Sequence, residues 1–244
     1  MMRLDKFLAE MGIGTRQEVK KYIRKGMVTV NGSPALRPEE KVSETSDQVC
    51  FEEKPVSYVK YEYYMLNKPA GVVSATEDRR DPVVVDLIRE KKRKDLFPAG
   101  RLDKDTEGLL LITNDGALAH RLLSPSHHVD KTYFVRVEGK VTGAEKKILE
   151  AGVDIGENGT EERTRPAKME ILASGPVSQV LLTIREGKYH QIKRMFQAVG
   201  MQVLYLKRLS MGKLTLDPAL APGEYRPLTK EEIASVTDEN AGKY

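Results

Sequence analysis

Acidic side chains gather most densely in the segment GRLDKDTEG, residues 100–108, which contains Asp103, Asp105 and Glu107. The spacing is similar to the start of a calcium-binding loop, but the twelfth position of such a loop is Asn114, where a bidentate glutamate is needed. Two-metal catalysis needs further carboxylates that converge on the first group, and the sequence has no second acidic cluster. A metal-dependent nuclease stays an alternative, and no metal site is predicted.

Asp103 taken alone is the stronger candidate for chemistry. It lies in a segment between Arg101 and the apolar run Leu109–Ile112, which is typical of a buried strand. Loops that rigid strands hold in place commonly carry catalytic groups. An aspartate is ionised at neutral pH, so Asp103 can act as a nucleophile or as a base without a helper.

Motifs for common cofactors and metals are missing from the sequence. It contains no G-x-G-x-x-G, G-x-x-x-x-G-K-[ST], H-E-x-x-H or G-x-S-x-G segment. The adjacent His127 and His128 would point to opposite sides of a strand, which disfavours zinc binding. The one cysteine, Cys50, excludes an internal disulfide and fits the reducing cytoplasm, where we expect the protein. A cofactor-free enzyme or a binding protein remains.

Positive charge is concentrated at the N-terminus. The whole chain has 40 Lys and Arg against 36 Asp and Glu, a net charge of +4, but residues 1–37 alone hold eight basic and three acidic residues, a net +5. Arg16, Lys20 and Arg24 recur every four residues, so on a helix they form one exposed row. Three bases without interleaved acids favour contact with an RNA backbone over a merely solvated face.

The elements that carry this row are two short helices and a hairpin. Apolar spacing predicts the first helix over residues 4–11, and Thr15 with Glu18 forms a capping box that begins the second. A strand over residues 27–30 follows, and Asn31-Gly32 is a strong signal for a hairpin turn.

From residue 61 onward, strand and helix patterns alternate. Strands are predicted over 63–66, 109–112, 132–137 and 179–185, and helices from Asp81 through Ile88, from Thr142 onward and over 192–199. The run REKKRKD, residues 89–95, is interpreted as the solvated basic end of the helix that starts at Asp81. No apolar stretch of about 18 residues is present, so no contact with a membrane is expected.

Four segments resemble, in order, the motifs of the RsuA-type pseudouridine synthases. They are MLNKPAGVVSAT (65–76), GRLDKDTEGLLLIT (100–113), SPSHHVDKTYFVRV (124–137) and REGKYHQIKRMFQAVG (185–200). The segment RLDKFLAEMGIGTRQEVKKYIRKGMVTVNG (3–32) is similar to the S4 RNA-binding domain. Because four motifs in one order do not arise readily by chance, the sequence is identified as a member of this family.

The resemblance implies an α+β fold with a small S4-like α/β RNA-binding domain joined to a larger pseudouridine synthase domain. The larger domain would contain a mostly antiparallel, mixed central sheet flanked by helices. The expected division is 1–46 for the S4 domain, 47–60 for a linker, 61–237 for the catalytic domain and 238–244 for a C-terminal tail. Pseudouridine formation is an isomerisation, so no cofactor is expected, in agreement with the missing motifs.

The resemblance also assigns roles to four residues. Asp103 would be the catalytic residue, either attacking C1′ or removing the C2′ proton, and both routes stay open. Tyr133 would stack on the uracil, although its strand face also fits a plain core position. Lys193 would keep Asp103 ionised, although its spacing alone fits a solvated helix position. Arg101 would help to hold the uridine out of its base stack.

Further residues are expected around this centre. The RNA-facing rim would include three basic residues, Arg185, Lys188 and Arg194. Asn67 and Lys68, in the first motif, are interpreted as packing around the catalytic loop. Asp105 and Glu107 are expected to hold that loop by hydrogen bonds.

The leading hypothesis is an isomerase that converts one uridine of 16S rRNA, by the resemblance the one at position 516, to pseudouridine. Its partner would be ribosomal RNA or the assembling small ribosomal subunit, and the protein would act as a monomer. A synthase for a 23S rRNA uridine and a non-catalytic S4-containing ribosome assembly factor stay open. The complete set of Asp103, Tyr133 and Lys193 argues against the assembly factor, because a pure binder does not need it.

Overall fold

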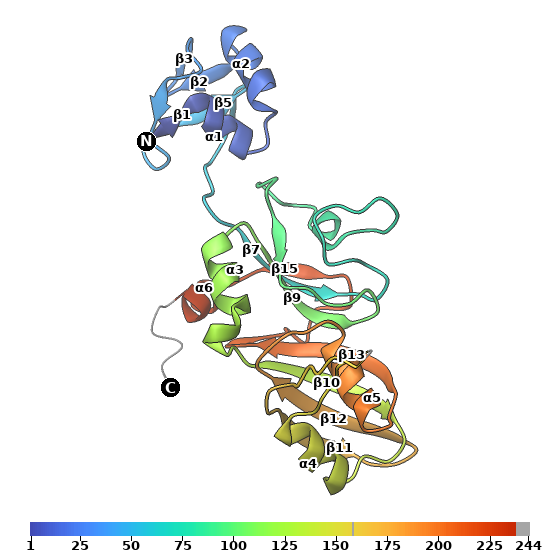
Figure 1. Cartoon of the computed structure of the whole chain (residues 1–244). Helices are drawn as coiled ribbons and strands as arrows, with labels where there is room; N and C mark the ends of the chain where they lie inside the picture. The colour runs from blue at the N-terminus through green and yellow to red at the C-terminus, as the bar shows by residue number, and fades with distance from the viewer. Residues whose placement is uncertain (158, 238–244) are drawn as a thin grey trace. The chain divides into compact units, whose positions relative to one another are not determined.

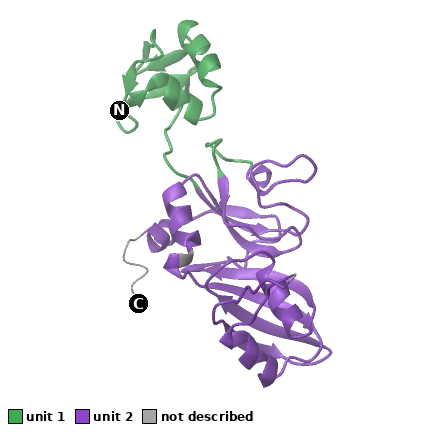
Figure 2. Cartoon of the chain, in the orientation of Figure 1, with its two compact units in different colours: residues 1–62, 89–96 green, residues 63–88, 97–244 purple. Residues whose placement is uncertain are grey.

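A computed structural model describes residues 1–157 and 159–237 of the chain (Figure 1). The predicted C-terminal tail, 238–244, lies outside the described residues. The chain divides into two compact units (Figure 2): residues 1–62 with 89–96, and residues 63–88 with the chain from Phe97 onward. No helix in the described ranges is long and apolar enough to cross a membrane.

The first unit contains two short helices and a small sheet. The helices are α1 (Leu4–Glu10) and α2 (Arg16–Arg24), and the sheet has the strand order β3 (Ser33–Pro34), β2 (Val28–Val30), β5 (Val49–Phe51) and β6 (Lys54–Pro55). A separate antiparallel pair consists of β1 (Met2–Arg3) and β4 (Lys41–Val42). Strands β5 and β6 lie within residues 47–60, which the sequence analysis treats as a linker, so the sheet of this unit extends into that segment.

The capping box predicted from the sequence begins α2. Thr15 Oγ1 accepts a hydrogen bond from the backbone N of Glu18 (3.3 Å), and Glu18 Oε2 accepts one from the backbone N of Thr15 (2.7 Å). Val19 and Ile23 are fully buried on the inner side of the helix. The row of Arg16, Lys20 and Arg24 therefore runs along the outer side of α2, where two of the three are exposed and Lys20 is half-buried.

A mixed, mostly antiparallel sheet forms the centre of the second unit and confirms the predicted fold class. Its strand order is β11 (Lys168–Ala173), β12 (Val177–Ile184), β10 (Lys131–Glu138), β13 (Val203–Met211), β9 (Glu107–Thr113), β7 (Tyr63–Lys68) and β15 (Tyr225–Pro227). Strand β14 (Leu214–Thr215) pairs with β13, and β8 (Phe97–Ala99) pairs with β9. Strands β13 and β9 are parallel, and they join the two halves of the sheet.

Helices cover this sheet. They are α3 (Gly116–Leu123), α4 (Gly143–Ala151), α5 (Gln191–Ala198) and α6 (Lys230–Thr237), with short 3₁₀ turns η1 (Val84–Leu87) and η2 (Pro125–His127). Helix α3 packs against β8, α4 against β11, α5 against β13 and α6 against β14 (Figure 1). One core cluster lies between α3, α6 and strands β7, β8 and β9, and includes the fully buried Met65, Leu109 and Leu118.

The helix predicted from Asp81 through Ile88 is wrong, because only the short turn η1 forms there. The backbone N of Val73 donates to Pro82 O (2.9 Å), and the backbone N of Val84 donates to Val73 O (3.0 Å). Val73 and Val83 form a parallel β-bridge. The bond to Pro82 O occupies the acceptor that the backbone N of Asp86 would use in the first turn of a helix, and the β-bridge holds Val83 extended.

The charged run 89–95 is also not the solvated end of a helix. It belongs to the first unit. Arg93 in this run is only 6% exposed, and its guanidinium pairs with Glu10 of α1 (2.9 Å) and with Asp95 (2.6 Å). Glu62 accepts hydrogen bonds from the backbone N of Arg93 (2.8 Å) and of the residue before it. Paired charge therefore anchors the segment to the first unit.

Gly108→Ala should destabilise the second unit by about 2–5 kcal/mol, from left-handed backbone strain and overpacking together. Gly108 has φ +102°, and a Cβ there would lie 2.2 Å from the carbonyl oxygen of Arg208, its parallel partner on β13. The free energy of unfolding in urea measures the loss. Gly200→Ala is the matched control, since Gly200 also has a positive φ (+76°) but no atom within 4 Å of the added carbon. Equal losses for the two variants would contradict the close approach.

Candidate active site

Asp103 lies in the loop that joins β8 to β9, where the sequence places it. The two strands pair antiparallel, with Phe97 opposite Thr113 and Ala99 opposite Leu111. Inside the loop, the backbone N of Thr106 donates to Asp103 O (3.1 Å). The buried Ser74 hydroxyl donates to Leu102 O (2.8 Å) and accepts from Leu102 N (3.0 Å). The backbone on each side of the aspartate is thus fixed.

The side chain of Lys68, on β7, donates hydrogen bonds to the same loop. Its Nζ is fully buried and donates to the carbonyl oxygens of Pro69 (3.0 Å), Lys104 (3.2 Å) and Thr106 (2.8 Å). Burial lowers the pKa of Lys68 to about 8, although Asp105, Asp103 and Glu107 act to raise it. Of the two residues expected to pack around the catalytic loop, Lys68 donates hydrogen bonds to it, whereas the Asn67 amide donates to Leu220 O (2.7 Å).

Two groups from the start of α5 contact the Asp103 carboxylate. Lys193 Nζ lies 3.2 Å from Oδ2, and His190 Nε2 lies 3.7 Å from Oδ1. Lys193 also bonds Asp105 at 2.6 Å. Burial acts to lower the pKa of Lys193, but the hydrogen bonds to Asp105 and Asp103 outweigh it and raise that pKa above its ordinary value. Lys193 is therefore a persistent cation that orients the Asp103 carboxylate.

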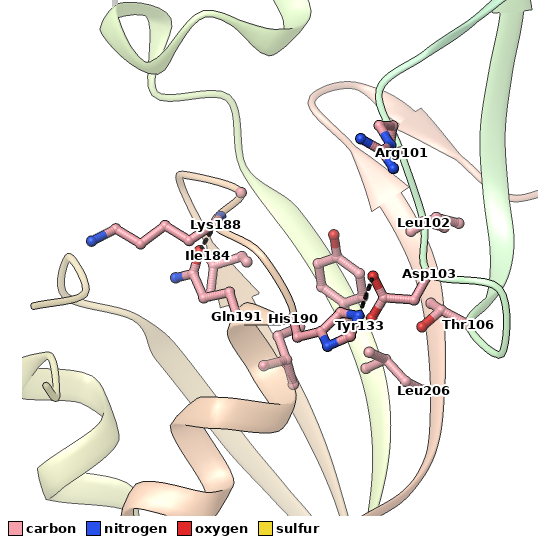
Figure 3. A pocket seen from close by; sticks show the side chains of 12 residues that line it. Arg101, Leu102, Asp103, Thr106, Tyr133, Ile184, Lys188, His190, Gln191 and Leu206 are labelled. Carbon is pink, nitrogen blue, oxygen red and sulfur yellow. Dashed lines mark hydrogen bonds and ion pairs between the residues drawn. The ribbon is translucent and has the colours of Figure 1, made fainter. Parts of the chain in front are cut away.

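A pocket that is open to solvent lies beside Asp103, and its empty space, with the open solvent included, is about 450 Å³ (Figure 3). Its lining residues come from the catalytic loop, strands β10, β12 and β13, and the start of α5: Arg101, Leu102, Asp103, Thr106, Tyr133, Ile184, Gly187, Lys188, His190, Gln191, Ile192 and Leu206. The ring of Tyr133 and the Asp103 carboxylate both line this pocket (Figure 3), and Tyr133 is only 7% exposed. Ile184 and Leu206 line it as well, so a flat heterocycle would have an aromatic ring and aliphatic side chains to pack against, with a carboxylate in the same lining.

The cavity brings together half of the ten site residues predicted from the sequence. Arg101, Asp103, Tyr133 and Lys188 line it, and Lys193 reaches the carboxylate from α5. Tyr133 is both a buried residue of β10 and a wall of the cavity, so its two interpretations are compatible.

The neighbouring acids have partners of their own, as expected for residues that hold the loop. Asp105 accepts from Lys193, and Glu107 accepts from the hydroxyl of Tyr205 (2.7 Å). Within the described part of the chain, no three His, Cys, Asp or Glu side chains are grouped as ligands of a metal ion would be.

Two of the predicted RNA contacts are engaged elsewhere. Arg194 is largely buried and pairs with Glu162 (2.7 Å) and Glu157 (3.4 Å), so its expected place on an RNA-facing rim is corrected to a structural role. Arg185 is exposed and pairs with Asp130 (2.6 Å). The basic row of α2 lies in the other compact unit.

His190 is the main site residue that the sequence analysis missed. It adopts a left-handed backbone (φ +46°) directly ahead of α5, which turns its ring toward Asp103. A signal was available, since His190 and Lys193 are three residues apart and would share one face at the start of the predicted helix. Gln191 was missed as well; it is buried and bonds Glu186 (2.8 Å) and the backbone N of Lys188 (2.9 Å).

Comparison with known proteins agrees with this site. A family model described as RNA pseudouridylate synthase matches residues 62–198, and the S4 domain model matches residues 2–49. The uncharacterized RNA pseudouridine synthase YtzG of Bacillus subtilis is 53% identical over 242 residues, which cover 98% of this chain and 100% of that protein. The ribosomal small subunit pseudouridine synthase A of Escherichia coli K12 is 43% identical over 241 residues, covering 96% and 100%.

A solved structure supports the same assignment. The crystal structure of a pseudouridylate synthase superposes with a TM-score of 0.66 at 40% identity and covers 97% of this chain and 100% of its own. The family model alone spans more than half of the chain and includes Asp103, Tyr133 and Lys193. The chain therefore belongs to the RNA pseudouridylate synthase family, as a pseudouridine synthase of the RsuA type with an N-terminal S4 domain.

Proposed function

We propose that the protein converts one uridine of small-subunit ribosomal RNA to pseudouridine, with Asp103 as the catalytic residue. The observation that carries this proposal is the Asp103 carboxylate in a pocket that Tyr133 also lines, 3.2 Å from Lys193. The choice of small-subunit RNA is supported by full-length relatives named as small-subunit enzymes. Position 516 of 16S rRNA is the target that the resemblance in the sequence implies.

The reaction is an isomerisation at the uridine. The N1–C1′ bond breaks, the uracil turns, and a C5–C1′ bond forms; the proton on C5 is lost and N1 gains one. Asp103 either attacks C1′ and is displaced when C5 attacks, or removes the C2′ proton and later returns it. In both routes the Asp103 carboxylate must face the ribose, and the contact with Lys193 (3.2 Å) orients it.

The remaining cavity residues would hold the extruded nucleotide. Tyr133 offers its ring face to the uracil, a contact worth about 1–3 kcal/mol per stacked base. Arg101 would occupy the space that the uridine leaves in the RNA, which offsets part of the cost of extrusion. Lys188 also lines the pocket, and its Nζ bonds Arg163 O (2.7 Å) and lies 3.7 Å from Glu162. As a cation in this lining it would contact the RNA backbone near the opening.

Tritium release from 5-tritiated uridine in 16S rRNA tests the proposal, because C5 loses its proton only when the new bond forms. The account predicts release of about one equivalent per 16S rRNA and none from 23S rRNA. Release from 23S rRNA alone would support the large-subunit alternative, and RNA binding without release would support the assembly factor. EDTA should leave the rate unchanged, whereas a metal-dependent nuclease would stop.

Replacing Arg16, Lys20 and Arg24 together by Ala should weaken RNA binding and flatten its salt dependence. Each lost phosphate contact should reduce the slope of log K against log salt by about 0.7 for single strands. Filter binding of 16S rRNA at several salt concentrations measures the slope. Arg37, Lys41 and Lys54, all exposed in the same unit but outside α2, give a triple-Ala control with equal charge loss. Equal slopes for the two triple variants would show that the row does not touch RNA.

A further inference from the structure

We propose that Tyr189 and His190 form a stacking platform for a second nucleobase, the one next to the target uridine in the same RNA strand. This subsite rests on the proposed function and extends it, because it gives the neighbouring base its own protein contact. Its ligand class is a nucleobase in a locally unpaired strand.

The rings of Tyr189 and His190 are stacked on each other. The ring centroids of Tyr189 and His190 lie 3.8 Å apart, and the ring planes differ by 20°. His190 lines the cavity and reaches Asp103 with its Nε2 (3.7 Å), as Figure 3 shows. Tyr189 is 74% exposed, whereas Tyr61, the other tyrosine among the exposed large side chains of the described residues, is 40% exposed. The stack thus continues from the cavity wall to the solvent.

The backbone under the stack is held in place. Arg194 Nη1 donates to Tyr189 O (3.1 Å), and the same guanidinium pairs with Glu162 (2.7 Å). The buried Gln191 accepts from the backbone N of Lys188 (2.9 Å) and donates to Glu186, which closes the loop before α5. A ring fixed in this way loses little conformational entropy when a ligand stacks on it.

A nucleobase fits this ring better than an apolar side chain of a protein partner. Drawing a uridine out of a strand leaves its neighbour without a stacking partner on one side, so an aromatic face at that point recovers free energy. The ring adjoins the cavity that holds the target nucleotide, and Lys188 in the same loop supplies positive charge for the connecting phosphate. Stacking accepts any base, so the subsite would contribute affinity and orientation without reading sequence.

Steady-state tritium release from 5-tritiated 16S rRNA tests the platform. Tyr189→Ala should raise KM about 5- to 150-fold, the effect of one lost base stack, and leave kcat within about threefold. Tyr189→Phe should restore KM, because phenylalanine keeps the ring. Leu172→Ala is the control, since Leu172 is 48% exposed on β11 and outside the cavity lining. An unchanged KM for Tyr189→Ala, or a loss confined to kcat, would overturn the proposal.

An RNA change provides the second half of the test. After the modified position is mapped, 16S rRNA is assembled with an abasic site on its 5′ side or on its 3′ side. On one of these RNAs wild type and Tyr189→Ala should have the same KM, because the stacking base is missing. If the KM of Tyr189→Ala stays above that of wild type on both RNAs, the platform does not bind a neighbouring base. The proposed function fails separately, if wild type releases no tritium from intact 16S rRNA.

Discussion

Asp103→Asn should lower single-turnover tritium release from 16S rRNA by at least about 10⁴-fold, as the loss of a nucleophile or base does in other enzymes. An amide has the size of the carboxylate, so the loop should keep its hydrogen bonds to Ser74 and Lys68, which involve backbone atoms of its neighbours. The amide of the variant, however, neither attacks C1′ nor takes the C2′ proton. RNA affinity should therefore change little while the chemical step is lost.

Asp105→Asn is the matched control for Asp103→Asn. Asp105 is two residues away and contacts the same Lys193 ammonium, but it is absent from the cavity lining. We expect a loss of no more than about tenfold, from a weaker charge-assisted hydrogen bond. Equal losses for the two variants would show that only the ion pair matters, and an active Asp103→Asn would refute the assigned role.

Lys68→Met should impair both stability and turnover, although Lys68 lies outside the cavity lining. The variant leaves three carbonyl oxygens without their donor, two of them in the catalytic loop, at a cost of about 2–4 kcal/mol in the free energy of unfolding. The loop would then relax, and a displacement of about 1 Å at Asp103 can cost roughly 10²-fold in kcat. Urea unfolding and single-turnover tritium release measure the two effects.

Lys104→Met is the control for Lys68→Met, because it removes a positive charge from the catalytic loop without removing the buried hydrogen bonds of Lys68. Lys104 Nζ is largely exposed and pairs with Asp81 (2.7 Å). Such surface pairs contribute only about 0–1 kcal/mol, so the variant should unfold and turn over almost as wild type does. A Lys68→Met protein that behaves like Lys104→Met would mean that the loop does not depend on the buried ammonium.

Local signals in the sequence were sufficient for several elements of the fold. The capping box of Thr15 and Glu18 begins α2, and Asn31-Gly32, with φ of +52° and +81°, turns the hairpin between β2 and β3. Apolar alternation found β10 and β12, and the unbroken run at 109–112 found β9. These features are set by residues that are close in sequence, which is the reason why a single chain reveals them.

Features that depend on partners distant in the sequence could not be predicted from residue patterns. Arg208 on β13 is 2% exposed and donates to Leu109 O (2.7 Å), whereas an arginine in a sequence predicts an exposed side chain. Arg93 is buried because Glu10, far away in the chain, neutralises it. The contact of Lys193 with Asp103 joins α5 to the loop between β8 and β9, which are far apart in the sequence, whereas spacing alone predicted a solvated position for that lysine. Family resemblance supplied the pairing, and the geometry then gave it a physical basis.

Mapping of the modified nucleotide tests the central claim most directly. 16S rRNA without modifications is incubated with wild type or with Asp103→Asn, treated with carbodiimide and alkali, and read by primer extension. The account predicts one new stop, at a single uridine, that appears with wild type and is absent with Asp103→Asn. No new stop in 16S rRNA, or the same stop with both proteins, would contradict it.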